Sequence, residues 1–437
     1  MFHDSAFARG GSTEADRRPP SAVSHGVGAA GLVGLIVWIA VARRFGMDGT
    51  YAALVNVAAC ALPMVLWSLL VDKVHRRAST GIDWARARPW RETIDVSLVK
   101  LAGLWITWAG IALIYMTGRF YWEGNYRFAM WCLEGAAPWL FAASIPYVLW
   151  LDRYLVEPRD GAWALGAWIT GTAPADRDAI HAHLRAWGVK AFFLAFMLAI
   201  VPPGFADFVD ADVANLLGSP VALSNWLINF MFVVDVAFAT VGYLLTMRPL
   251  DAHIRSANPY MAGWTAALIC YPPFIMMDDG RPFDYRPGTA DWTHWMQGHP
   301  TLLGITGAVL VVLTGIYAWS TVAFGLRFSN LTNRGILTHG PYALSRHPAY
   351  LSKNLFWWVS TIPFLTTGSL ADAARATILL AAVSGIYYWR AKTEERHLRL
   401  DPNYQAYDAW IARRGAVPRF LRWARGGATA PASPAQA

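Results

Sequence analysis

The stretch that decides the fold is PTLLGITGAVLVVLTGIYAWSTVAFG, residues 300–325, which contains no charged side chain. A helix needs about 20 mostly apolar residues to cross the hydrocarbon core of a bilayer, and this stretch is long enough. Further stretches of predominantly apolar character occur along the chain, and together with the first they predict an all-α, polytopic transmembrane helical bundle of about ten spans. They are residues 26–42, 51–71, 96–117, 128–151, 187–204, 225–247, 260–277, 350–367 and 371–391.

The composition favours a membrane protein over a large soluble helical enzyme. Of the 437 residues, 55% are hydrophobic and only 15% are charged, whereas soluble domains have about 25% charged residues. The 23 tryptophans suit the two membrane interfaces, where an apolar ring with a polar group is most stable. The formal net charge of +8 resides in loops beside apolar runs. Basic loops of this kind set the orientation of the helices in the membrane and attract anionic lipid headgroups. We therefore expect no nucleic-acid partner.

The distribution of basic residues predicts the orientation. With the N-terminus in the cytoplasm, the outer loops hold only seven of the 37 Lys and Arg residues, whereas the 72–95 loop on the inner side is rich in them. Cytoplasmic loops of membrane proteins carry this excess, so both termini are expected in the cytoplasm, and a bacterial inner membrane is the expected location. The seven outer residues are Arg43, Arg44, Arg119, Arg127, Arg281, Arg286 and Arg375.

Four regions are predicted along the chain. Residues 1–24 are polar and contain no signal-peptide pattern, so we expect a disordered cytoplasmic tail, and low-complexity residues 426–437 are expected to form a second tail. Residues 25–299 form an N-terminal transmembrane bundle of unknown role, and residues 300–425 form a hairpin and cofactor-binding region. The three cysteines lie in apolar stretches and predict neither a disulfide framework nor a metal site.

A group of chemically varied side chains distinguishes the C-terminal quarter. The hairpin formed by spans 350–367 and 371–391 should bring segments 338–350 and 390–420 together at one membrane face. This places cationic, aromatic and anionic side chains in one pocket. An alternative interpretation is that Arg346 and Lys353 bind lipid headgroups while Glu394 pairs with Arg390 on a solvated helix face. The pocket residues are His339, Tyr342, Arg346, His347, Tyr350, Glu394 and Glu395.

Two motifs follow one another in this region. T-x-G-P-Y-x-x-x-R-H-P-x-Y runs from Thr338 to Tyr350, and R-x-x-x-E-E-x-x-L runs from Arg390 to Leu398. A Y-x-x-Y pair at Tyr404 and a closing Pro-Arg at Pro418 come after them. Residues 325–422 thereby resemble the integral-membrane isoprenylcysteine carboxyl methyltransferase and phospholipid methyltransferase superfamily.

The resemblance implies a cytosol-facing site for S-adenosylmethionine and a lipid-like or small hydrophobic methyl acceptor that enters from the membrane. Arg346 and Glu394 are the expected catalytic residues. Lys353, Asn354 and Trp357 are the expected acceptor-binding residues. The residues expected to bind the cofactor are His339, Gly340, Tyr342, His347, Pro348, Tyr350, Glu394 and Glu395. The acceptor and the oligomeric state are left open.

The side-chain chemistry suits this cofactor independently. Glu394 and Glu395 suit its ammonium group, and Arg346 suits its carboxylate. Aromatic rings suit the adenine and the sulfonium. No metal is needed, because methyl transfer is an in-line displacement that depends on positioning. The acceptor is a carboxylate, an amine or a thiol, and an amine would require a base such as Glu394 or His347.

Two other functions remain open. One is a sterol-reductase-like membrane enzyme that uses NADPH, since such enzymes share a distant form of this C-terminal architecture. The other is a transporter or sensor with a vestigial methyltransferase domain. In that case Glu134, Asn229 and Asp235, which are polar residues within predicted spans, would be the functional groups.

Overall fold

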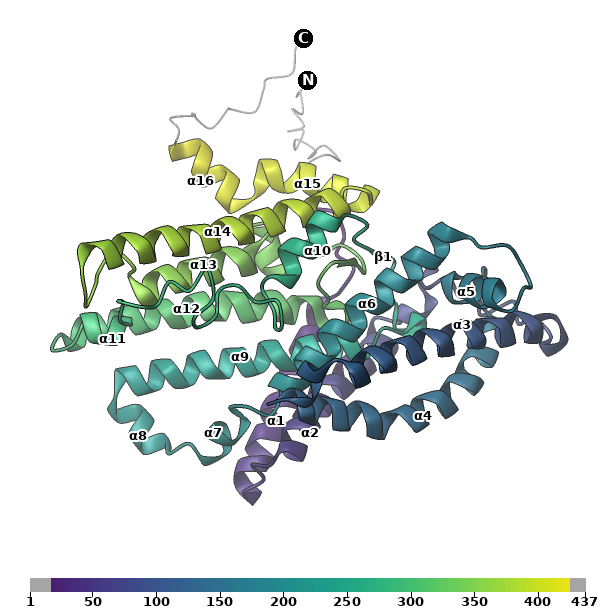
Figure 1. Cartoon of the computed structure of the whole chain (residues 1–437), viewed down its shortest axis with the longest axis horizontal. Coiled ribbons are helices and arrows are strands. Elements are labelled where there is room, and N and C mark those ends of the chain that lie inside the picture. The colour runs from purple at the N-terminus through teal and green to yellow at the C-terminus, as the bar shows by residue number, and fades with distance from the viewer. Residues whose placement is uncertain (1–16, 425–437) are drawn as a thin grey trace, which may run out of the picture.

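The computed structural model describes residues 17–424, and within them it contains eight helices long and apolar enough to cross a membrane. The predicted all-α polytopic bundle is confirmed, and the protein is an integral membrane protein. Figure 1 shows most of these helices in two groups that extend to opposite sides of the picture. The long helices are α1 (His25–Phe45), α2 (Thr50–Leu66, continued to Val71), α3 (Trp90–Thr117), α4 (Tyr126–Asp152), α6 (Arg177–Ile200), α9 (Pro220–Leu244), α12 (Pro300–Phe324) and α14 (Leu370–Leu398).

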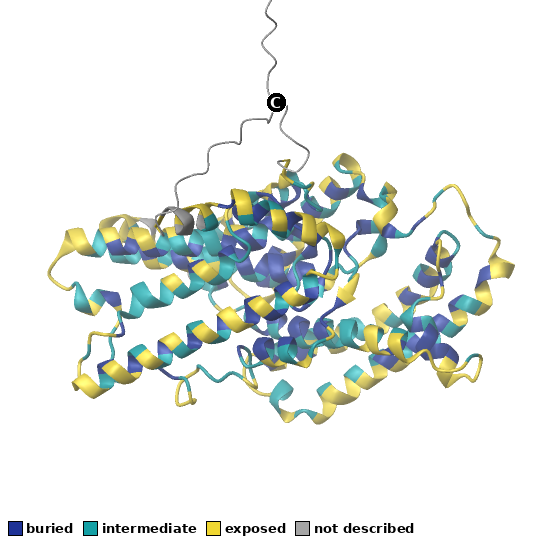
Figure 2. Ribbon diagram, turned by 90° about the horizontal axis from the view of Figure 1, so that it is seen from above, coloured by how far each residue is buried: buried dark blue, intermediate teal, exposed yellow. Residues whose placement is uncertain are grey.

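Helix α12 shows how the apolar sequence forms the bundle. Pro300 occupies its first turn, where the missing N–H has no partner in any case, and Gly325 ends it with a φ of 52°. Its small residues face α9: a Cβ on Gly307 would lie 2.3 Å from Ser224 Oγ. Such small residues allow close helix packing within lipid. Its opposite face exposes apolar side chains such as Val312, and Figure 2 shows exposed residues along the outer faces of the long helices.

Two of the ten predicted spans are not long helices, so eight of the ten are long apolar helices within the described residues. In the 260–277 region, helix α10 (Met261–Leu268) stops before Pro272 and Pro273, neither of which has an N–H to continue it. In the 350–367 region, helix α13 (Pro348–Thr361) has 14 residues and ends just before Pro363. At 1.5 Å per residue α13 is about 21 Å long, shorter than the roughly 30 Å of a bilayer core.

The chain nevertheless runs the length of the bundle at both places. Asn258 contacts the Thr393 carbonyl near the end of α14, and Arg375, near the start of α14, donates to the Asp284 carbonyl at 3.1 Å. Thr366, just before α14, donates to the Gly288 carbonyl. Segment 258–288 therefore runs antiparallel along α14, and α10, α13 and α14 lie together in Figure 1.

Shorter elements complete the fold. Strands β1 (Ser256–Ala257) and β2 (Thr332–Asn333) pair antiparallel and join segments far apart in the sequence. The remaining α-helices are α5 (Gly161–Ile169), α7 (Phe205–Asp210), α8 (Val213–Gly218), α11 (Trp292–Trp295), α15 (Pro402–Arg414) and α16 (Ala416–Ala424). Short helical turns of other types span Trp67–Val71, Val74–Arg76, Ala78–Thr80, Arg119–Trp122, Arg248–Leu250, Gly325–Arg327 and Gly340–Ala343.

Part of the predicted N-terminal tail is packed against the C-terminal quarter. The Ala22 N–H donates to the Ile336 carbonyl at 2.9 Å, the Thr338 hydroxyl donates to the Pro19 carbonyl, and Ser21 Oγ lies 2.7 Å from His339 Nδ1. Residues 17–24 are therefore not the disordered tail that the sequence predicts, because backbone and hydroxyl groups of the 336–339 segment hold them. The remainder of that predicted tail, residues 1–16, and the predicted tail 426–437 lie outside the described residues.

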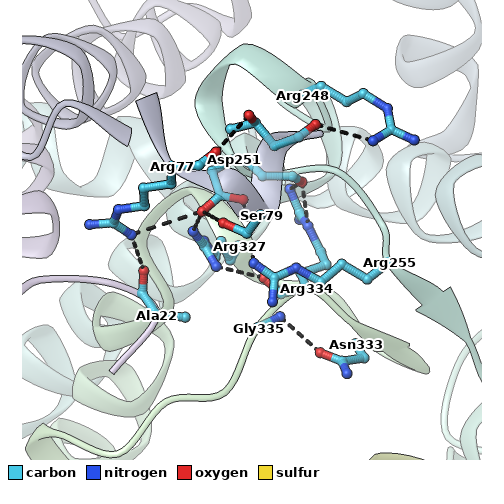
Figure 3. Close-up of polar contacts among 12 residues, drawn as sticks. Ala22, Arg77, Ser79, Arg248, Asp251, Arg255, Arg327, Asn333, Arg334 and Gly335 are labelled. Atoms are coloured by element: carbon cyan, nitrogen blue, oxygen red, sulfur yellow. Dashed lines mark hydrogen bonds and ion pairs between the residues drawn. The ribbon is translucent and has the colours of Figure 1, made fainter. Parts of the chain in front are cut away.

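A buried cluster of charges joins the end of α9 to the end of α12 (Figure 3). Asp251 is 1% exposed, and its carboxylate lies 2.5 Å from Arg327 Nη2 and 3.3 Å from Arg255 Nη2. It also accepts a hydrogen bond from Ser79, and Arg77 lies at 3.9 Å. This cluster therefore connects the 72–89 loop, α9 and α12.

Arg334, beside this cluster, has no carboxylate partner among the described residues. Its guanidinium donates instead to the carbonyls of Gly242, Leu245, Ala252, Leu326 and Phe328. Burial, and then the charge of Arg327, lowers its pKa to about 9. One side chain thereby satisfies backbone groups at the ends of both α9 and α12.

Replacing Arg327 with Met should destabilise the protein by about 3–5 kcal/mol, because it leaves the buried Asp251 carboxylate without its nearest partner. Thermal unfolding of the detergent-purified protein measures this. The control is Arg119→Met, which removes an exposed ion pair with Glu123 and should change little. Equal, small effects of both substitutions would contradict the assigned role of Arg327.

His339 should make the packing of the N-terminal segment sensitive to acid. Burial, followed by the charges of His25 and Arg18, lowers its pKa to about 4, against an ordinary value of 6.5. The folded state therefore binds this proton less readily than the unfolded state does. Stability should fall as the pH drops from about 6.5 towards 4.

The measurement is the thermal unfolding temperature of the wild type and of His339→Gln across this pH range. The variant should lose less stability on acidification than the wild type, since the remaining titratable groups contribute equally in both proteins. Parallel curves would show that the proton does not bind at His339.

Candidate functional site

A cavity lies where α12 and α14 end and α13 begins. It encloses about 1240 Å³ of empty space, a figure that includes its open mouth. Its walls come from α12, segment 326–337, α13, α14 and α15. The N-terminal bundle contributes little of the lining. It holds the cavity walls in position through the charged cluster around Asp251.

The two sequence motifs meet in this cavity. His347 Nε2 lies 3.0 Å from Glu395 Oε1, and the Tyr350 hydroxyl donates a hydrogen bond to Glu394 Oε1. The imidazole of His347 is stacked on the Tyr350 ring with centroids 5.7 Å apart and an interplanar angle of 5°. Side chains more than 40 residues apart in sequence thus form one unit, as the predicted hairpin requires.

Half of the predicted site residues line the cavity. They are Tyr342, Arg346, His347, Tyr350, Lys353 and Glu394. The others support those residues or face elsewhere.

Four predicted cofactor ligands do not line the cavity, and three of them lie at or near the start of α13. His339 contacts Ser21 and packs edge-on against His25 at 4.1 Å. Gly340 adopts a φ of 58°, but the neighbour beside it is the indole of Trp319. Pro348 is buried at the first turn of α13, as predicted. These residues shape the backbone that presents the motif.

Glu395 lies behind the cavity wall. It is 2% exposed and bonded to His347, Lys392 and Arg399. With these contacts it orients His347, and a ligand in the cavity does not touch it. Of the paired glutamates, Glu394 is the one that faces the ligand space.

Arg346 is engaged within the protein. Its Nε lies 2.5 Å from Asp408 Oδ1, and its Nη2 donates to the Asp408 carbonyl. This pair links the motif at the start of α13 to helix α15. To bind the carboxylate of the cofactor as predicted, Arg346 would have to contact that carboxylate and Asp408 at the same time.

Arg390 is the centre of the site, and the sequence motif did not assign it to the pocket. It is 1% exposed and donates to Asn330 Oδ1 at 2.7 Å, and its Nε lies 3.4 Å from Glu394 Oε1. Its guanidinium also faces the rings of Tyr271 at 5.3 Å and Tyr350 at 5.1 Å. The signal in the sequence was an arginine at the inner end of a predominantly apolar predicted span.

Lys353 occupies the part of the cavity that extends along α12. Its ammonium lies over the rings of Trp357 at 5.2 Å, Tyr317 at 5.5 Å and Tyr387 at 5.7 Å. No ion pair of Lys353 exists among residues 17–424. Asn354, also predicted to bind the acceptor, points back along α13 and donates to the Tyr350 carbonyl. Trp357, the third residue predicted to bind the acceptor, contacts the Lys353 ammonium with its ring.

Asp235 of α9 lies next to this aromatic group. It is 8% exposed and accepts hydrogen bonds from the Tyr317 hydroxyl at 2.9 Å and from the Thr321 hydroxyl. The other two polar residues noted in the N-terminal spans, Glu134 and Asn229, are exposed on their helices. Only Asp235 of these three adjoins the cavity lining.

Two hydroxyl groups in the cavity wall have no hydrogen-bond partner within the described part of the chain. They belong to Thr332 and Tyr404. Burial raises the pKa of Tyr404, so its hydroxyl stays protonated. Buried hydroxyls normally have partners, which indicates a polar ligand or water at this wall. Over the same residues no group of three His, Cys, Asp or Glu is placed to hold a metal ion.

Comparisons with known proteins bear on the C-terminal quarter alone. No curated protein and no solved structure gave a match to the chain. A family model does match the region that supplies α12, both motifs and most of α15. Residues 294–411 match the family described as a protein of unknown function, DUF1295.

Proposed function

We propose that the protein transfers a methyl group from S-adenosylmethionine to a lipophilic acceptor within this cavity. The observation that carries the proposal is the state of Glu394. Its Oε1 accepts from Tyr350 and lies beside Arg390, whereas its Oε2 has no donor within residues 17–424. A carboxylate that lines the cavity and has one oxygen without a donor suits the ammonium of an amino-acid cofactor.

The other walls suit the rest of the cofactor. The stacked rings of His347 and Tyr350 suit an adenine ring or a sulfonium cation. The free hydroxyls of Thr332 and Tyr404 suit a polar group such as a ribose. When bound, the cofactor supplies an electrophilic methyl group. The residues of the chain hold and orient the reactants and exclude water from them.

The charges of the cavity favour this cofactor over NADPH. NADPH brings several phosphate charges, and among the lysine and arginine side chains of the lining only Lys353 lacks a protein acceptor within the described residues. The four arginines of the lining are already occupied by protein acceptors: Arg327 by Asp251, Arg334 by carbonyls, Arg346 by Asp408, and Arg390 by Glu394 and Asn330. A sterol-reductase-like enzyme remains the alternative that the binding experiment tests.

The proposed location is a bacterial inner membrane with the cavity on the cytoplasmic side. S-adenosylmethionine is a cytoplasmic metabolite, and the basic 72–95 loop lies at the same end of the bundle as the cavity, since Arg77 and Ser79 reach Asp251. The positive-inside rule places such a loop in the cytoplasm.

Binding of S-adenosylhomocysteine to the protein in detergent, measured by isothermal titration calorimetry, tests the proposal. The wild type should bind S-adenosylhomocysteine and not NADPH. Glu394→Gln should weaken binding at least tenfold, because a charge-assisted hydrogen bond to the ammonium is lost. Glu123→Gln, at an exposed glutamate far from the cavity, is the matched control and should bind normally.

Thermal unfolding establishes that each variant is folded. Binding of NADPH in place of S-adenosylhomocysteine would overturn the proposal in favour of a reductase. Equal affinity of Glu394→Gln and the wild type would remove Glu394 from the site.

A further inference from the structure

The aromatic end of the cavity contains a cation and an anion that do not neutralise each other by direct contact. The Lys353 ammonium lies over three aromatic rings, one of which is Tyr317. The Tyr317 hydroxyl donates to Asp235 at 2.9 Å. Tyr317 therefore stands between the two charges, and both Tyr317 and Lys353 line the cavity.

This end adjoins the Glu394 end through Tyr387. Lys353 lies 5.7 Å from the Tyr387 ring centroid, and Arg390 lies 6.0 Å from it. A ligand at Lys353 and a ligand at Glu394 would thus share one continuous space. This is the arrangement that a methyl acceptor and a methyl donor require.

The site lies within the membrane-spanning part of the bundle. Asp235 precedes the end of α9 at Leu244 by nine residues, which at 1.5 Å per residue places it about 14 Å below that end. This depth suits a lipophilic molecule that enters from the bilayer. A charged pair maintained there requires a functional explanation, because ionisable groups inside a membrane are costly.

The pair of opposite charges selects the type of acceptor. A carboxylate needs no base, which would leave Asp235 and the Tyr317 hydroxyl without a role, and an amine, protonated at neutral pH because its pKa is about 10, would be repelled by Lys353. An aliphatic alcohol is too weak an acid for a carboxylate base. A phenol is neutral at pH 7, with a pKa of about 10, and its anion gains from a nearby ammonium.

We propose that Lys353, Tyr317 and Asp235 form the acceptor subsite and that the acceptor is a lipophilic phenol. This inference rests on the proposed methyl transfer and names its substrate class. Lys353 stabilises the phenolate oxygen, and the ring of Tyr387, which lines the cavity, packs against the aromatic acceptor. Asp235 is a positioning residue that acts through the Tyr317 hydroxyl.

The reaction balances with these groups. An O–C bond forms between the phenol oxygen and the methyl group, and the S–C bond of the sulfonium breaks, which leaves a neutral thioether. The phenol proton passes to the Tyr317 oxygen as the Tyr317 proton passes to Asp235. The positive charge that the sulfonium loses is balanced by the proton that reaches Asp235.

The first test requires no cofactor. The probe is 4-nonyl-2-nitrophenol, whose anion absorbs visible light, titrated in the presence of the full-length protein in nanodiscs. Bound to the wild type, the probe should ionise at a pH at least one unit lower than when bound to Lys353→Met, because a neighbouring cation favours the anion by this amount or more. Lys353→Arg keeps the charge and should behave like the wild type. Identical titrations in the wild type and in Lys353→Met would overturn the subsite.

The second test compares acceptors with tritiated S-adenosylmethionine. The wild type should methylate 4-nonylphenol and leave lauric acid and dodecylamine unmodified. Asp235→Asn should slow methylation of 4-nonylphenol about 100-fold, as expected for loss of a base. It should slow methylation of the nitrophenol by less than tenfold at pH 8, where the nitrophenol is already ionised.

Tyr317→Phe should reproduce this difference and keeps the test decisive if Asp235→Asn is unstable. Equal losses with both phenols would show that Asp235 acts only on the structure and would overturn its role. Methylation of the fatty acid or the amine instead would overturn the phenol assignment. Failure to bind S-adenosylhomocysteine would overturn the methyl transfer, whereas the probe titration would still decide whether the subsite exists.

Discussion

The ion pair between Asp251 and Arg327 is the interaction on which the rest of the structure depends. Two charges 2.5 Å apart, at 1% and 4% exposure, are stable only while each compensates the other. Arg334 lies beside them and bonds to carbonyls at the ends of α9 and α12. The ends of these two helices are therefore fixed in position.

This fixed position of the helix ends also determines the position of one cavity wall. Segment 326–337, which carries Arg327 and Arg334, forms one wall of the cavity, and Asn330 from it bonds to Arg390 at 2.7 Å. Arg390 in turn lies beside Glu394, which contacts Tyr350. A connected series of polar contacts thus runs from the N-terminal bundle to both motifs. This explains how the first 299 residues serve the site while contributing almost none of its lining.

The cavity combines two different environments. At one end Glu394, His347 and Tyr350 present hydrogen-bonding groups near the ends of the helices. At the other end Lys353 and its aromatic rings lie deeper in the bundle. A polar molecule from water and a lipophilic molecule from the membrane can meet only where such environments adjoin. Arg390 and Tyr387 occupy that boundary.

Sequence alone determined the fold class and the meeting of the two motifs. Apolar length identifies spanning helices, and a hairpin must return its two flanking segments to the same side. The sequence did not reveal that α13 is short or that the helix ends after α10. Pro and irregular backbone are tolerated in a membrane only where protein contacts satisfy the backbone groups, and here α14 provides these contacts.

Only the tertiary structure distinguished between residues for which the motif predicted the same role. Glu394 faces the cavity and Glu395 does not, since adjacent residues on a helix point in different directions. His339 packs on a segment more than 300 residues away, and Asp235 joins Tyr317 from another helix. No local pattern encodes such contacts, because they depend on which helix faces pack together, and that is decided by the shapes and charges of both partners at once.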